Sequence, residues 1–184
     1  MKYRSCRNSW EQNVAEKLIG VVVFAFAVPA NVPTNNRLKS IAEKCAKHAA
    51  STNMELCPIF TQPDIAIGTE FDVQYIEEEP NAPSPTLRIA QEAVVWAKVR
   101  GIRYFWIIAA KPHLWRCVRD LKMAIAEAKA DITLLVPEEI KQSKYMSWFE
   151  SQSTQYRTQS FSHWWPRELL LYLAPYDIYK HIAN

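Results

Sequence analysis

Glycine is scarce in this chain of 184 residues, which contains only Gly20, Gly68 and Gly101. The glycine-rich loops that cradle phosphates, GxGxxG and the Walker loop, are absent, so a dinucleotide site that needs close backbone approach is poorly supported. The chain also lacks the GxSxG turn that carries the nucleophile of α/β-hydrolases. Any ligand site must therefore be built mainly from side chains.

Cysteine is sparse as well, and no CxxC pair is present, so the sequence predicts no zinc site. Cys45 and Cys57 lie in otherwise apolar stretches, which predicts buried free thiols and fits a reducing compartment. The four cysteines are widely scattered, at Cys6, Cys45, Cys57 and Cys117.

Charge is modest in amount and uneven in distribution. Apolar residues make up 49% of the chain, charged residues 22%, and the net charge is +3. This composition predicts a globular domain, and without a reader motif we expect no nucleic-acid partner. Seven acids and no base lie between Asn53 and Leu87, whereas eight bases lie between Arg88 and Lys122. If these segments face each other they favour an anionic small molecule, and the alternative is local pairing on solvated helix faces.

An apolar run from Leu18 to Ala30 follows the basic residues Lys2, Arg4 and Arg7. This arrangement has features of a signal peptide, but the leading region is long and contains acids. The run is rich in Val and Phe, which favours a buried strand, and it is too short to cross a membrane as a helix. We therefore expect no membrane span and a cytoplasmic location.

Strand and helix patterns alternate along the chain, which predicts parallel strands joined by helical crossovers. The expected fold is a three-layer αβα Rossmann-like domain with a mostly parallel sheet of about five strands. It forms one domain over 1–184, with an N-terminal extension at 1–17 and a C-terminal helix at 163–184. The expected strands are 19–28, 56–60, 71–76, 104–110 and 132–136, and the expected helices are 8–17, 37–50, 84–100, 113–128 and 164–181, the last bent or broken at Pro175.

The loop from Ala110 to Arg116 is the first candidate site, since it follows a buried strand and opens a helix. His113 and Arg116 are three residues apart and share one side of the first turn. His113 is a candidate catalytic acid/base or neutral hydrogen-bond donor, while Arg116 and Lys111 are candidate anion ligands. The alternative is a plain helix start with surface charges.

Other loops at the same expected edge of the sheet supply further candidates. Ser84, as an N-cap before Pro85, and Thr86 form a possible anion cradle at a helix start. The acids Glu77, Glu78 and Glu79 cannot all reach one ion, so we expect a solvated run and no metal. The remaining candidate ligand-binding residues are Thr61, Gln62 and Asp64 after a strand, and Arg167 and Glu168 beside Trp164 and Trp165, which are expected to pack against the sheet.

The order of these motifs resembles the YdcF/SanA/ElyC-like family, a bacterial domain of unassigned function. The resemblance implies a Rossmann-like domain and allows a nucleotide-like ligand such as S-adenosylmethionine, but it implies no defined reaction. It is carried by the first strand Leu18–Val28, the helix opening Ser84–Thr86, the small-residue-x-x-His-x-x-Arg loop Ala110–Arg116 and the segment Trp164–Glu168.

The chain departs from that family where members usually carry glycine. Ala25–Pro29 follows the first strand in place of glycines, and Thr61–Asp64 replaces a Ser-Gly-Gly-like turn. Arg88 and Ile89 replace the acidic and amide residues of the family. These departures put part of the family's pocket in doubt.

Two functions remain open from sequence. One is a small-molecule-binding domain, either an enzyme or not, that acts on an anionic or nucleotide-like ligand; an open basic cleft beside His113 with Trp164 buried would favour it. The other is a non-catalytic accessory or protein-interaction domain with a degenerated pocket. An exposed apolar patch around Trp148, Phe149, Phe161 and Trp164 would favour the second.

Overall fold

The structure is a computed structural model that describes residues 19–53, 57–78 and 84–182. The helix expected over 8–17, the extension 1–17 and Glu79 lie outside the described residues. In the part of the chain that is described, no helix is both long enough and apolar enough to cross a membrane.

The centre of the fold is a five-stranded parallel sheet with the strand order β3-β2-β1-β4-β5. β1 has the sequence IGVVV and is buried at every position, as expected for a central strand covered on both faces. The chain runs from β1 to β2 on one side and returns to β4 on the other, so the strand order reverses between β1 and β4. The strands are β1 (Ile19–Val23), β2 (Ile59–Thr61), β3 (Val73–Tyr75), β4 (Tyr104–Ile108) and β5 (Thr133–Leu135).

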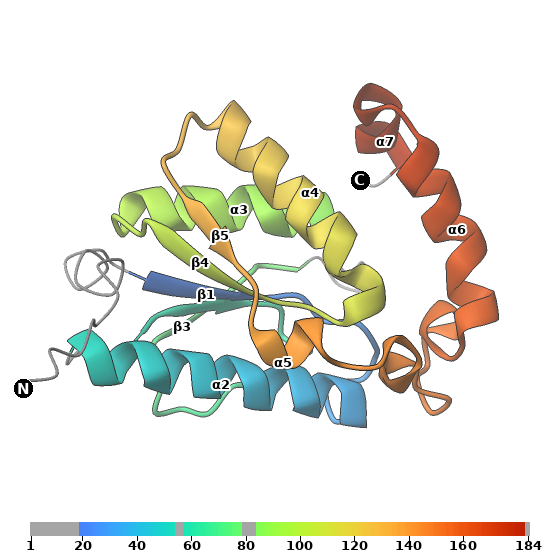
Figure 1. Ribbon diagram of the computed structural model, residues 1–184, viewed down its shortest axis with the longest axis horizontal. Helices are drawn as coiled ribbons and strands as arrows, with labels where there is room; N and C mark the ends of the chain where they lie inside the picture. Colours follow the sequence, from blue (N-terminus) through green and yellow to red (C-terminus); the bar gives the residue numbers. More distant parts are fainter. Residues whose placement is uncertain (1–18, 54–56, 79–83, 183–184) are drawn as a thin grey trace, which may run out of the picture.

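Helices cover both faces of this sheet and give three layers, which confirms the predicted Rossmann-like α/β fold (Figure 1). α2 (Pro33–Asn53) lies on one face and α3 (Thr86–Val99) and α4 (Lys111–Glu127) on the other. The sheet has a hydrophobic core on each face. Leu38 and Ile41 of α2 pack in one core, whereas Val94 of α3 and Leu121 of α4 pack in the other. The remaining elements are α5 (Glu138–Lys141), α6 (Phe161–Leu173), α7 (Tyr176–Ile182) and two 3-10 turns, η1 (Tyr145–Trp148) and η2 (Tyr156–Thr158).

β1 ends at Val23, before the predicted end at Val28. The Phe24 N–H still donates to the Ile108 carbonyl of β4 at 2.9 Å, but the N–H groups beyond it are held by side chains. The Ala25 N–H donates to Gln62 Oε1 at 2.9 Å, the Phe26 N–H to Asn35 Oδ1 at 3.3 Å and the Val28 N–H to a serine hydroxyl at 3.3 Å. Buried amides need partners, and these side chains supply them while the chain leaves the sheet. The apolar residues after Val23 therefore form a wall at the carboxyl edge.

Helix ends show one wrong prediction and one confirmed one. α3 begins at Thr86 with Pro85 in extended conformation before it, so Ser84 is not its N-cap and makes no capping hydrogen bond. The other end is as predicted, because Gly101 follows the helix with φ 70°, a left-handed conformation that glycine adopts without strain.

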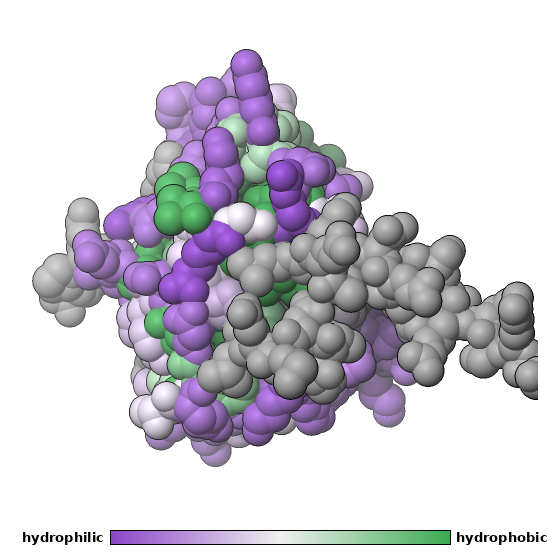
Figure 2. Space-filling view, turned by 90° about the vertical axis from the view of Figure 1, so that its left-hand side faces the viewer, coloured by the Kyte–Doolittle hydropathy of each residue, from purple (hydrophilic) through white to green (hydrophobic). Residues whose placement is uncertain are grey.

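The C-terminal segment breaks at Pro175 into α6 and α7, as predicted, and α6 begins earlier than expected, at Phe161. Ser160 caps it by accepting from the His163 N–H. Trp164 is buried, but Trp165 is 46% exposed, so the expectation that both pack inside is wrong for Trp165. In Figure 1 both helices stand beside the carboxyl ends of the strands. Figure 2 shows the opposite end, where hydrophilic side chains cover most of the coloured surface.

Candidate functional site

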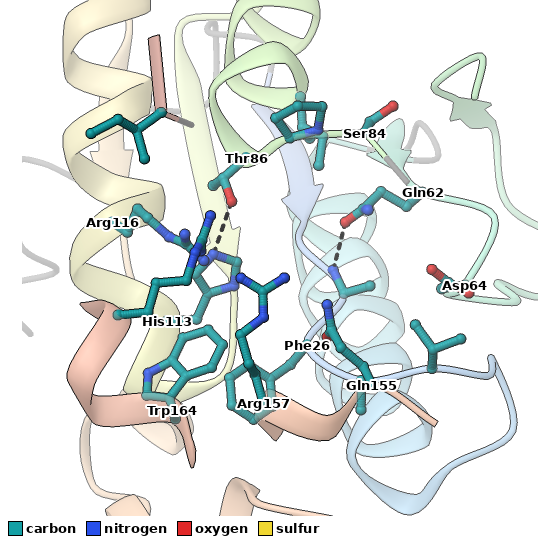
Figure 3. Close-up of a pocket in the computed structure, with 17 residues that line it drawn as sticks. Phe26, Gln62, Asp64, Ser84, Thr86, His113, Arg116, Gln155, Arg157 and Trp164 are labelled. Carbon is teal, nitrogen blue, oxygen red and sulfur yellow. Dashed lines mark hydrogen bonds between the residues drawn. The ribbon is translucent and has the colours of Figure 1, made fainter. Parts of the chain in front are cut away.

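A cavity of about 230 Å³ lies at the carboxyl edge of the sheet, next to the point where the strand order reverses. This is the place where parallel α/β sheets bind ligands. Its wall combines the segment after β1, the loop after β2, the starts of α3 and α4, and side chains from the C-terminal third of the chain (Figure 3). The pocket is thus assembled from five parts of the sequence.

His113 lies deep in this wall, on the first turn of α4. Its Nε2 is 3.1 Å from Thr86 Oγ1, and its ring packs edge-on against Phe24 and Trp164. Burial, together with the positive charges of Arg116 and Arg167, holds the pKa of His113 well below its ordinary value of 6.5. His113 is therefore a neutral imidazole at neutral pH, able to donate from one nitrogen and accept at the other.

Arg116 and Glu168 form a buried ion pair behind the cavity. Arg116 Nη2 is 3.4 Å from Glu168 Oε1, and the two side chains are 8% and 3% exposed. Neither Glu168 oxygen nor Arg116 Nε has a hydrogen-bond partner among the described residues. Burial raises the pKa of Glu168, against the opposing effect of the nearby arginines. Arg116 thus keeps hydrogen-bonding capacity that its protein partner does not use.

Two further arginines, Arg157 and Arg167, line the same cavity. Arg157 comes from η2 and Arg167 from α6, and within the described ranges neither guanidinium has a hydrogen bond or an ion pair at contact distance. Burial and the charges of Arg116 and Arg157 lower the pKa of Arg167. Three guanidinium groups therefore gather around one cavity, and Glu168 forms a buried ion pair with one of them, Arg116.

The other side of the cavity is lined by amide, hydroxyl and carboxyl groups. Gln62 donates from Nε2 to Glu78 at 3.5 Å and accepts the Ala25 N–H, so both ends of its amide are engaged. Burial and the neighbouring charge of Glu78 raise the pKa of Asp64. In Figure 3, Asp64 and Gln62 lie across the cavity from His113 and Arg116. The cavity thus has a cationic side and an acceptor-rich side.

Seven of the residues predicted to form the site line this cavity, and three do not. Lys111 Nζ donates to the carbonyls of Lys141 and Ser143, at 2.6 and 2.8 Å, and so fastens α4 to the segment after α5. Thr61 Oγ1 donates to the Val23 carbonyl at 3.3 Å, between β2 and β1, and Glu168 lies behind Arg116. The seven in the wall are Gln62, Asp64, Ser84, Thr86, His113, Arg116 and Arg167.

Sequence reasoning missed Phe26, Gln155 and Arg157, which also form the wall. The apolar pattern places Phe26 within a strand. Gln155 and Arg157 lie in an irregular stretch that is held at the site by contacts with Val28, from the Thr154 N–H at 2.9 Å and from the side chains of Ser153 and Thr154. Contacts between segments so far apart in sequence leave no local residue pattern that would place this stretch at the site.

The acidic segment and the basic segment face each other at two contacts, and one further contact is local pairing within a helix. Arg100 forms an ion pair with Asp72, and Arg88 pairs with Glu92 at 2.8 Å and donates to the Glu77 carbonyl at 3.0 Å. These contacts are exposed and lie away from the cavity wall. The cationic side of the cavity takes Arg116 from the basic segment, and its other two arginines, Arg157 and Arg167, lie outside that segment.

The fold and the site define a Rossmann-like α/β domain with a side-chain-built cavity at its carboxyl edge. Comparison with family models, curated proteins and solved structures gave no match to this chain. Over 19–53, 57–78 and 84–182, no three metal-binding side chains of His, Cys, Asp or Glu are grouped as they would be around an ion.

Proposed function

We propose that this chain is a small-molecule-binding domain that holds an anionic ligand at the carboxyl edge of its sheet. The observation that carries the proposal is the gathering of Arg116, Arg157 and Arg167 around one cavity, where Arg116 pairs with Glu168 and the other two have no contact partner among the described residues. Arg116 is buried and Arg157 and Arg167 are half-buried, and charged groups are costly to bury without partners, so such an arrangement favours an anion from solution.

His113 and Thr86 supply the polar groups beside that anion. A neutral imidazole either accepts a proton from the ligand or orients it by a hydrogen bond, and the position of His113 suits both roles. Trp164, buried at 5% exposure, closes the apolar side of the cavity. This combination, a basic cavity beside His113 with Trp164 inside, supports ligand binding over the alternative drawn from sequence.

The finer relationship to YdcF/SanA-like proteins belongs to this proposal and rests on the motif order alone. It brings S-adenosylmethionine and other nucleotide-like compounds into the set of ligands to test. The cavity of about 230 Å³ lies below the roughly 300–1,000 Å³ of sites for drug-sized ligands. Its size favours a small compound, or one anionic end of a larger one.

A thermal-shift screen with small anions, nucleotides and S-adenosylmethionine tests the proposal. A ligand that binds only the folded state stabilises it by about 2.7 kcal/mol at a hundred times its Kd. Arg157→Gln and Arg167→Gln should remove that shift while leaving the unliganded Tm nearly unchanged, because neither guanidinium has a contact partner to lose. Arg103→Gln is the control, since it makes the same substitution at an arginine that is not part of the cavity wall. Arg103 lies just before β4 and pairs with Asp131. An anion panel that never raises the Tm would overturn the proposal.

A second candidate function, a protein-interaction domain, is favoured by the exposed face of α6. Leu170, Tyr172 and Leu173 are 71%, 67% and 68% exposed. Large apolar side chains gathered on one helix are typical of contact surfaces. An exposed patch around Trp148, Phe149, Phe161 and Trp164 would also have favoured this function, but Trp148 and Trp164 are buried. Leu170→Ser with Leu173→Ser should abolish any concentration-dependent association seen by sedimentation, and a wild type that never associates would count against self-association.

A further inference from the structure

We propose that the anion this cavity takes is the dianionic phosphate of a small phosphomonoester whose body carries hydroxyl groups. This inference rests on the proposed function and narrows it to one ligand class. It follows from the charge on one side of the cavity and from the acceptors on the other.

The cationic side requires more than one negative charge. On this side of the cavity Arg116 pairs with Glu168, whereas Arg157 and Arg167 have no carboxylate at contact distance among the described residues. The other carboxylate of the wall, Asp64, lies across the cavity, so two positive charges have no countercharge beside them. A carboxylate ligand would compensate one of them, whereas a phosphomonoester carries about −1.5 to −2 at neutral pH. Planar guanidinium groups bind phosphate oxygens in pairs, and three of them match the three free oxygens of a phosphomonoester.

His113 adds hydrogen bonding to this side without adding charge. Because burial and the arginines lower its pKa and keep its imidazole neutral, it does not compete with them for the anion. The start of α3 at Thr86 also lies in the wall, where unpaired backbone N–H groups of a first helical turn favour an anion. The phosphate is thus expected between His113 and the arginines.

The far side of the cavity determines what the phosphate is attached to. Asp64 lines it, and its carboxylate has no hydrogen bond or ion pair among the described residues. The side chain of Gln155 is likewise free of hydrogen bonds there. A carboxylate repels a second anion and accepts hydrogen bonds, so the ligand must present donors to it. Hydroxyl groups on the carbon skeleton of the phosphate ester fulfil that requirement, and the small cavity limits how large that skeleton is.

Calorimetric titration with three matched probes tests the inference on the full chain. Glycerol 3-phosphate offers phosphate and hydroxyls, methyl phosphate offers phosphate without them, and glycerate offers hydroxyls with a monoanionic carboxylate. We expect glycerol 3-phosphate to bind most tightly and glycerate to bind at least about tenfold more weakly, a difference of about 1.4 kcal/mol.

Two variants test separately how each side of the cavity contributes to binding. Arg167→Gln should weaken both phosphate probes by about tenfold, which is the usual cost of a charge-assisted hydrogen bond. Asp64→Asn should weaken glycerol 3-phosphate severalfold and leave methyl phosphate unchanged or slightly tighter. Arg103→Gln, at the amino end of β4, should change neither affinity, and circular dichroism should show each variant folded.

The possible outcomes distinguish this inference from the function on which it rests. If glycerate binds as well as glycerol 3-phosphate, the phosphate assignment is overturned and anion binding stands. If Asp64→Asn affects the two phosphates equally, the hydroxylated body is overturned. If none of the probes and no inorganic phosphate binds, the inference fails; the proposed function fails with it when the wider anion panel also never raises the Tm.

Discussion

Thr86 and His113 are joined by a buried side-chain hydrogen bond, with Oγ1 and Nε2 3.1 Å apart. The two residues open α3 and α4, the pair of helices on one face of the sheet. His113 Nδ1 has no partner among the described residues, so Thr86 supplies the hydrogen bond that fixes the imidazole. The geometry of the cavity therefore depends on a contact between two helix starts.

Replacing Thr86 tests this dependence. Thr86→Val keeps the shape and removes the hydroxyl, which leaves Nε2 unpaired in a buried site and should cost about 1–3 kcal/mol of unfolding free energy. Thr86→Ser keeps the hydroxyl and should cost less than Thr86→Val. Urea unfolding followed by tryptophan fluorescence measures both. Equal losses for the two variants would mean that the methyl group, and not the hydrogen bond, carries the stability.

The lowered pKa of His113 predicts a pH dependence of stability. An unfolded histidine takes up a proton near 6.5, whereas folded His113 does not until the pH is well below that value. The unfolded state then binds more protons, so stability falls as the pH falls. Between about pH 7 and about pH 5.5, protonation of His113 in the unfolded state should lower the unfolding free energy by roughly 1 kcal/mol.

His113→Gln is the control for this dependence of the unfolding free energy on pH. The raised pKa values of Asp64, Asp120 and Glu168 act in the opposite direction, because folded carboxyls that hold protons favour the folded state as the pH falls. These contributions are present in both proteins, so the difference between wild type and variant isolates His113. A wild type that keeps pace with the variant down to about pH 5.5 would show that folded His113 protonates normally.

The attachment of α7 gives a prediction that links stability to binding. The Tyr179 hydroxyl donates to Asp120 Oδ2 at 2.5 Å, and both side chains are fully buried. Arg119 lies 3.5 Å from the centre of the Tyr179 ring. Tyr179→Phe removes the donor and should cost about 1–3 kcal/mol. Because Ile182 at the end of α7 lines the cavity, anion binding should weaken as well.

Hydrogen exchange resolves where that loss occurs. Amides of 176–182 should exchange faster in Tyr179→Phe, while those of β1 and β4 keep their protection. Tyr172→Phe provides the comparison, since Tyr172 is 67% exposed and has no hydrogen bond to lose in the described structure. Uniformly faster exchange over the sheet would contradict a local role for the Tyr179 contact.

At two helix ends the residue after the helix has a positive φ, so we expect glycine to be more stable than another residue at both positions. Gly101 has φ 70°, and a methyl group on its Cα would meet no atom within 4 Å, so Gly101→Ala should cost about 1 kcal/mol from the backbone alone. Lys129 follows α4 with φ 48°, and Lys129→Gly should gain up to about 1 kcal/mol. For a domain of this size the Tm should move by about 2–4 °C in each direction.

The main strands and helices were readable from the sequence because each leaves a local pattern. β1 and β4 are apolar runs within the core. Pro175 separates α6 from α7 and Gly101 follows the end of α3, as the sequence predicts. The N-cap at Ser84 failed because the preference concerns a serine immediately before the helix, whereas Pro85 occupies that place. The Ser84 N–H donates instead to Glu78 at 3.3 Å.

The sequence predicted those residues of the candidate site that follow the carboxyl ends of strands. His113, Arg116, Gln62 and Asp64 follow strand ends, and the rule for parallel sheets places such residues together. Arg157 has no such marker, since it lies in an irregular stretch that backbone and side-chain contacts with the distant Val28 hold at the cavity. Lys111 shares a helix start with His113, yet two carbonyls of the α5 segment lie within its reach and hold its amine.

The cavity wall begins at Ala25 and ends at Ile182, so nearly the whole described chain separates its first residue from its last. During synthesis on the ribosome, domains fold from the N-terminal side as the chain emerges. A nascent chain that has completed the five strands would still lack Arg157, Trp164 and Arg167. Ligand can therefore assist only the last stage of folding, and a compound that rescues a weakened variant should act after translation has passed these residues.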